Sequence, residues 1–143
     1  MATLTSANSS LVLAIANLYP SPQLIQGYTA DDAFMAESLD MAEVVMGVDG
    51  IMSSAFVFNP VKMTITLQAT SPSIDIFDAW SNFQRGSREL YQANGSIVLP
   101  AIGKKYTLTN GVLTSSKLFP DVKKTLQPVA YSLTWESVIS ENF

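Results

Sequence analysis

The sequence of 143 residues contains no cysteine and no histidine. These absences exclude disulfides, thiolate nucleophiles, zinc sites built from cysteine and histidine, and Ser-His-Asp triads. Long hydrophobic runs are missing too: the longest, Leu11–Ala16, covers six residues, where a membrane-spanning helix needs about 20. The first residues, MATLTSANSS, lack the basic start and apolar core of a signal peptide. We therefore expect a protein without membrane contact that is made in a cytoplasm.

Charge is also scarce. Lys, Arg, Asp and Glu make up 14% of the chain, against about 25% in an average soluble domain. Hydrophobic residues make up 48%, which argues against disorder, and the net charge of −4 argues against a nucleic-acid-binding surface. Serine and threonine, with 17 and 11 copies, supply the polar surface instead. Such a surface suits a subunit covered by its neighbours, and it equally suits a Ser/Thr-rich monomer.

The charges are unevenly distributed along the chain. Residues 1–80 carry eight acidic side chains and one basic one, for a sum of −7, whereas residues 81–143 carry four acidic and seven basic ones, for +3. If the two regions lie on different faces, a head-to-tail contact between copies pairs opposite charges. If the charges mix in space, only their sum matters.

Apolar alternation and turn residues predict a mainly β chain. The expected strands lie within Leu11–Leu18, Leu24–Tyr28, Met41–Val48, Ile51–Phe58, Lys62–Ala69, Ile97–Leu99, Lys104–Leu108, Val112–Leu118 and Pro128–Ile139. Asp49-Gly50 and Asn110-Gly111 predict hairpin turns, and the two prolines of Tyr19–Pro22 predict a break between the first two strands.

A single helix is predicted from Ser71 to Gly86. Ser71 suits the N-cap, Pro72 the first helical position and Gly86 the C-cap. Every third position of this segment is aliphatic or aromatic, which predicts a stripe that packs on the sheet. The residues of this stripe are Ile74, Phe77, Trp80 and Phe83.

Candidate chemical sites are weak. The acidic residues that offer oxygen ligands for a cation such as Ca²⁺ are Asp31, Asp32, Glu37 and Asp40. Their spacing differs from that of a calcium loop, which favours a solvated acidic loop. The pairs Lys104-Lys105 and Lys123-Lys124 are isolated and give little support for phosphate binding. We therefore expect no enzyme, no catalytic residue, no metal and no cofactor.

These patterns predict a flexible N-terminal arm at residues 1–10 and a single β domain at residues 11–143. The expected architecture is a small β-sandwich or barrel with one helix packed on it.

The order of several segments is similar to that of a known family. The segments are the Gly-x-Asp-Gly turn Gly47–Gly50, the strand Val61–Gln68, the Ser-Pro-opened aromatic helix Ser71–Gly86, the segment Lys105–Thr114 and the closing strand Pro128–Ile139. Together they resemble the tail tube proteins of contractile-tailed bacteriophages, which are related to the Hcp tube of type VI secretion and to pyocin tubes. The resemblance covers roughly residues 11–139.

The resemblance implies a structural virion protein of the phage tail, assembled in the host cytoplasm. Six copies would close into a ring, and rings would stack head to tail into a tube through which DNA passes without specific binding. The implied partners are further copies, the tail sheath protein, and the tape-measure and baseplate proteins. The N-terminal arm and a hairpin would join stacked rings. The hairpin residues are Val48, Asp49, Gly50, Ile51, Met52, Phe56 and Phe58.

Other functions remain open at this stage. A pyocin or type VI secretion tube subunit shares the class, and a tail-terminator or baseplate-hub relative would stop at one ring. A monomeric β-barrel that binds a small apolar ligand belongs to another class and needs a cavity of several hundred Å³. The bulky aromatic and aliphatic residues at inward positions argue against such a cavity.

Overall fold

The computed structural model describes residues 9–27 and 34–142. Within these residues the chain forms nine strands and one helix. Their bounds are β1 Ser10–Ile15, β2 Tyr19–Ile25, β3 Phe34–Ala36, β4 Ala42–Met46, β5 Met52–Phe56, β6 Val61–Leu67, α1 Ile74–Ser87, β7 Ala93–Leu99, β8 Lys104–Ser116 and β9 Val129–Asn142. Of the expected N-terminal arm, residues 1–8 lie outside the described residues, and Ser10 begins β1.

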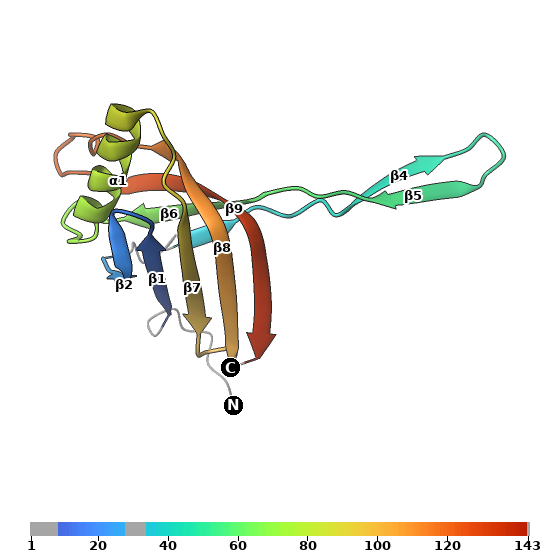
Figure 1. The fold of residues 1–143 in the computed structure, drawn as a ribbon, viewed down its shortest axis with the longest axis horizontal. Coiled ribbons are helices and arrows are strands. Elements are labelled where there is room, and N and C mark those ends of the chain that lie inside the picture. The colour runs from blue at the N-terminus through green and yellow to red at the C-terminus, as the bar shows by residue number, and fades with distance from the viewer. Residues whose placement is uncertain (1–8, 28–33, 143) are drawn as a thin grey trace.

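Seven strands form one antiparallel sheet in the order β2-β1-β7-β8-β9-β6-β3. The sheet is strongly curved, and α1 lies at one end of it (Figure 1). The curvature brings residues of β3 and β7, which three other strands separate in the sheet order, onto the walls of one cavity. β4 and β5 form a separate two-stranded ribbon. This architecture confirms the predicted fold class, mainly β with one helix.

The core follows the period-two pattern of the strands. In β6 the buried residues are Met63, Ile65 and Leu67, as the alternation of Lys62–Ala69 predicts. The matching alternation in β9 buries every second residue from Val129 to Trp135. Because these strands pair directly, their buried side chains meet on one face of the sheet.

α1 covers this core with part of its aromatic stripe. Phe77 and Trp80 are fully buried, Ile74 is half-buried against the core, and Phe83 is 51% exposed. The ring of Phe77 stacks on that of Tyr131 in β9, with centroids 4.5 Å apart. The indole Nε1 of Trp80 donates a hydrogen bond to the carbonyl of Tyr91 at 3.0 Å, so the aromatic residues both pack the helix and fix its position.

The helix begins later than predicted. Ser73, not Ser71, occupies the N-cap position, and α1 starts at Ile74. The hydroxyls of both serines contact Gln26 at the end of β2: Ser71 donates to its carbonyl, and Ser73 accepts a hydrogen bond from its N–H at 2.8 Å. The predicted cap serine is therefore used to join the helix start to the sheet.

The helix also ends beyond Gly86. It continues to Ser87, and Arg88 adopts the left-handed conformation with φ 59° and donates its N–H to the carbonyl of Gln84. The predicted glycine C-cap is wrong by two residues, since the non-glycine Arg88 takes the position that glycine usually occupies.

The break between the first two strands falls before the prolines. Asn17, with φ 67°, forms the turn, and β2 starts at Tyr19 and runs through Pro20 and Pro22. β2 is an edge strand of the sheet. Proline is tolerated there because an edge strand has N–H groups that need no partner strand.

The expected hairpin at Asn110-Gly111 is wrong. β8 continues through this dipeptide, where Asn110 has φ 49°, and pairs with β7 and β9 on either side of it, with a register shift opposite Ala93–Gly95. A Cβ atom on Gly111 would lie 2.3 Å from the six-membered ring of Trp135. The glycine is therefore required by the close approach of this buried ring, and not by a turn.

Candidate functional site: a projecting apolar hairpin

β4 and β5 form a hairpin that extends far from the body of the protein (Figure 1). Its pairing continues toward the body through a hydrogen bond from the N–H of Val57 to the carbonyl of Met41 and one from the Asn59 amide to the carbonyl of Asp40, both 2.9 Å. The N–H of Glu37 then bonds to the carbonyl of Lys62. We call residues 37–60 the hairpin arm.

A tight turn closes the tip of the arm. The N–H of Gly50 bonds to the carbonyl of Gly47, and the N–H of Gly47 bonds to the carbonyl of Ile51. Gly50 has φ 83°, which favours glycine, and the Asp49 carboxylate accepts the N–H of Ile51 at 3.0 Å. The hairpin turn that Asp49-Gly50 predicts is therefore present, and its loop has three residues, Val48–Gly50.

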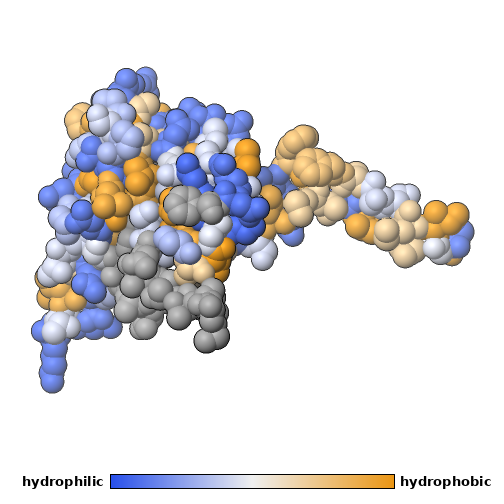
Figure 2. All heavy atoms as spheres, turned by 90° about the horizontal axis from the view of Figure 1, so that it is seen from below, coloured by the Kyte–Doolittle hydropathy of each residue, from blue (hydrophilic) through white to orange (hydrophobic). Residues whose placement is uncertain are grey.

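The arm exposes many large apolar side chains. Every residue of β4 and β5 is exposed, and Phe58 reaches 91% exposure. The exposed large hydrophobic residues of the arm are Leu39, Met41, Val44, Val45, Met46, Val48, Ile51, Met52, Phe56 and Phe58. Hydrophobic residues accordingly cover much of the projecting segment (Figure 2). Contiguous exposed apolar surface of this kind marks an interaction site.

The two faces of the arm differ. The register pairs Ala42 with Phe56, Val44 with Ser54 and Met46 with Met52, which places these six residues on one, mainly apolar face. The other face carries the pairs Glu43 with Ala55 and Val45 with Ser53. Near the base, the rings of Phe56 and Phe58 make an edge-to-face contact with centroids 4.8 Å apart.

The charge of the arm has a single sign. Residues 37–60 contain four carboxylates and no Lys or Arg. All four, Glu37, Asp40, Glu43 and Asp49, are exposed. The arm is therefore acidic as well as apolar.

A free arm of this shape is marginally stable. An isolated two-stranded hairpin lacks a third strand or a helix to bury its apolar face. Each of its two strands also presents one edge without a partner strand, and such edges pair readily with another chain. The arm thus leaves apolar surface and strand edges that contact with another chain would cover.

The hairpin residues predicted from the sequence all lie in the arm. Val48, Asp49, Gly50 and Ile51 form the tip, Met52 and Phe56 bound β5, and Phe58 lies near the base. The strand predicted at Met41–Val48 is confirmed as β4, but the residues of β4 are not among the predicted site residues. The exposed apolar side chains of β4, with the preceding Met41, are Met41, Val44, Val45 and Met46. Their apolar run predicts a strand, but the same run is typical of a buried strand.

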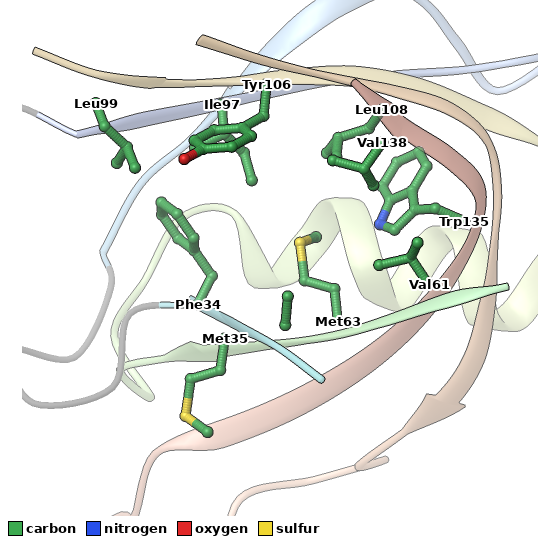
Figure 3. Close-up of a pocket in the computed structure, with 11 residues that line it drawn as sticks. Phe34, Met35, Val61, Met63, Ile97, Leu99, Tyr106, Leu108, Trp135 and Val138 are labelled. Atoms are coloured by element: carbon green, nitrogen blue, oxygen red, sulfur yellow. The ribbon is translucent and has the colours of Figure 1, made fainter. Parts of the chain in front are cut away.

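A second feature is an apolar cavity of about 340 Å³ inside the curved sheet (Figure 3). The side chains that line it are Phe34, Met35, Ala36, Val61, Met63, Ile97, Leu99, Tyr106, Leu108, Trp135 and Val138. The indole Nε1 of Trp135 is buried and has no hydrogen-bond partner among the described residues. Bulky residues therefore leave the interior partly open, contrary to the expectation from the sequence.

The acidic residues considered for a cation are only partly visible. Asp31 and Asp32 lie outside the described residues. In residues 9–27 and 34–142 no three Asp or Glu side chains gather in a way that would hold a metal ion. The single helix of these residues, α1, lacks the length and apolar character that crossing a membrane requires.

The shifted pKa values belong to Tyr131 in the core and to the half-buried Asp78 of α1. Burial raises the pKa of the Tyr131 hydroxyl to about 12, and the negative charge of Asp78 adds to the shift. Burial also raises the pKa of Asp78, with nearby Asp75 as the second cause. These groups therefore affect stability and lie outside the hairpin arm.

The chain is similar to a known family and to several solved structures. Residues 2–139 match the family described as tail fiber protein gp32. No curated protein matches the sequence. Among solved structures, a chain from the baseplate of the anti-feeding prophage aligns with a TM-score of 0.67 and 12% identity, covering 99% of this chain and 98% of that one.

Two further solved chains show the same fold. One is from the sheath-tube complex of an extracellular contractile injection system, PVC, in the extended state, with a TM-score of 0.61, 13% identity and coverage of 93% and 88%. The other is from the tube-terminating cap of the anti-feeding prophage, with a TM-score of 0.55, 12% identity and the same coverage of 93% and 88%. At identities this low, the structural alignments show a shared fold and nothing more.

Proposed function

The chain belongs to the family of tail fiber protein gp32, and on this premise we propose that it is a non-enzymatic structural subunit of a contractile tail that assembles into stacked hexameric rings. The hairpin arm is the observation that carries this proposal. In a monomer the apolar side chains and the two strand edges of the arm stay uncovered, whereas contact with a neighbouring copy covers them.

The shared fold supports the same class of function. The similar chains come from a baseplate, a sheath-tube complex and a tube-terminating cap, and the baseplate structure is six-fold symmetrised. In such a tail the partners of this chain are further copies, the sheath outside, and the tape-measure and baseplate proteins. The similar chains come from the anti-feeding prophage and from an extracellular contractile injection system, whereas the matching family is named for a tail fiber protein. Sheath, baseplate and tape-measure genes beside the coding gene would identify the particle.

The charge of the chain suits a conduit for DNA. Six copies at −4 each give −24 per ring. A net negative ring repels phosphate, so DNA passes through without being held. The low overall charge and abundant hydroxyls suit faces that neighbours cover.

Electron microscopy of the purified chain tests the proposal. Negative-stain images over a range of concentrations should show rings or hollow rods. The double variant V48D/I51D places two charges at the exposed tip of the arm and should leave folded monomers, since neither residue contributes to the core. The matched control V48L/I51L keeps the tip apolar and should still assemble.

Two results would contradict the proposal. Wild-type protein that stays monomeric at every concentration, alone and with a baseplate extract, would remove self-assembly. Rods formed by V48D/I51D would remove the role of the arm tip. Circular dichroism of each variant shows that its fold is intact.

The apolar cavity supports a second candidate function, a monomeric β-barrel that binds a small apolar ligand. A cavity of about 340 Å³ lies within the size range of ligand pockets. Titration with hexanol should then quench or shift the fluorescence of Trp135, and Val138→Phe, which fills the cavity, should abolish the change. An unchanged spectrum in the wild-type protein excludes this function for small alcohols.

A further inference from the structure

Resting on the proposed function, we propose that the hairpin arm of one copy docks on the loop between β8 and β9 of the next copy. This loop, residues 117–128, is called the β8–β9 loop. Contact between its basic, apolar surface and the acidic, apolar arm would then hold the assembly together.

The β8–β9 loop has a defined shape. The N–H of Gln127 bonds to the carbonyl of Asp121 at 3.0 Å, and Val122 forms a bridge with Leu126. The N–H of Lys117 bonds to the carbonyl of Ala130 in β9. Because these bonds cross the loop, its exposed side chains are presented by a folded platform.

Like the arm, the β8–β9 loop exposes large apolar side chains. Its large apolar residues are exposed, with Val122 at 75%. They are Leu118, Phe119, Val122 and Leu126. Lys123 and Lys124 are exposed beside them and form no ion pair with any described carboxylate, because the described ion pair of this region joins Lys117 to Asp121.

The charges of the two surfaces are opposite. Residues 37–60 carry −4, and the β8–β9 loop carries three lysines and one aspartate, for +2. An arm that docked on a second arm would bring carboxylates together, which opposes contact. The apolar cavity offers no charged side chain to the arm, since all its lining residues are uncharged. The basic loop complements the arm in both respects, in charge and in exposed apolar side chains.

The position of the loop also fits. The arm projects from one side of the body, and the β8–β9 loop lies beside α1 on the opposite side (Figure 1). The arm points away from the loop of its own chain, so contact requires a second copy. Contacts between opposite ends of identical subunits are heterologous and propagate into closed rings or open stacks.

Charge reversal tests this docking in the full-length chain. We compare K123E/K124E on the loop with D40K/E43K on the arm; Asp49 is kept because its carboxylate holds the turn. Each double variant should raise the concentration needed for rods, measured by pelleting and negative stain, by about tenfold or more, as the loss of about 1.4 kcal/mol per contact implies. The control K104E/K105E makes the same charge change elsewhere and should assemble as wild type.

Mixing the two variants gives the sharpest result. In an equal mixture, the acidic arm of K123E/K124E meets the unaltered basic loop of D40K/E43K. The arm of D40K/E43K, which carries two lysines and two remaining carboxylates and so has no net charge, meets the acidic loop of K123E/K124E and places its lysines near the new glutamates. The concentration needed for rods should therefore fall in the mixture to within about threefold of the wild-type value. A threefold difference corresponds to roughly 0.7 kcal/mol of contact free energy.

Several outcomes overturn the docking assignment. They are rods of K123E/K124E at the wild-type concentration, an equal loss in K104E/K105E, or no recovery in the mixture. Normal tubes of K123E/K124E that no longer bind sheath protein would assign the loop to the sheath instead. If wild type assembles and V48D/I51D does not, any of these results removes the docking surface and leaves the proposed function standing.

Discussion

Replacing Gly111 by alanine tests the tightest contact of the fold. A Cβ atom at this position would lie 2.3 to 2.7 Å from three atoms of the six-membered ring of Trp135. Trp135 is fully buried and β8 is held between β7 and β9, so the clash is relieved only by a shift of this buried ring toward the cavity that it lines. Overpacking of a core typically costs 1–3 kcal/mol, and this site belongs at the upper end, at about 3 kcal/mol.

Urea unfolding followed by tryptophan fluorescence measures this loss. Gly111→Ala should lower the unfolding midpoint and leave the slope of the transition unchanged. Gly86→Ala is the matched control, because a Cβ at Gly86 meets nothing within 4 Å. Since Gly86 lies in α1, alanine there should stabilise the protein by up to about 1 kcal/mol. The same substitution thus has opposite signs at the two sites.

A double variant separates the ring contact from other effects. Trp135→Phe removes the fused ring system, so in that background Gly111→Ala should cost about 1 kcal/mol or less. A Gly111→Ala protein within about 0.5 kcal/mol of wild type would refute the argument that this ring requires a glycine.

Two further predictions concern the core under α1. Because the pKa of Tyr131 is raised to about 12, its neutral hydroxyl contributes stability that is complete below pH 10 and is lost as the pH rises toward 12; Tyr131→Phe should flatten the loss of urea stability over that range, and parallel curves would contradict the assignment. Ser73→Ala removes the acceptor of the part-buried hydrogen bond from the N–H of Gln26 and should lower stability by about 1 kcal/mol. Ser87→Ala, at an exposed hydroxyl that bonds to the carbonyl of Phe83 and to the N–H of Glu89, should change it by less than about 0.5 kcal/mol.

The parts of the fold that the sequence predicts well are those with a local cause. The alternation in β6 and β9 follows from side chains that point to opposite faces of a strand, so burial can be assigned without knowing the partners. The same holds for the turn at Asp49-Gly50, where the glycine supplies the positive φ and the aspartate the hydrogen bond.

The wrong predictions have causes elsewhere in the chain. Asn110-Gly111 has the residues of a hairpin turn, but the ring of Trp135, 24 positions later, decides its conformation. The prolines of β2 look like a strand break until the sheet order places that strand at an edge. Ser71 looks like a helix cap until Gln26 is found within reach of its hydroxyl. Each decision depends on a contact that no local pattern contains.

The candidate site shows the same limit more strongly. The apolar run of β4 predicts a strand and says nothing of whether a core or another chain covers it, because both environments select the same residues. What distinguishes the arm is charge: its carboxylates have no basic neighbour between residues 37 and 60. If free arms were uncharged, their unpaired edges would join arm to arm. Four carboxylates per arm disfavour that pairing and leave docking on a basic surface favourable. Although the chain carries little charge, the charges of the arm therefore determine which surface it binds.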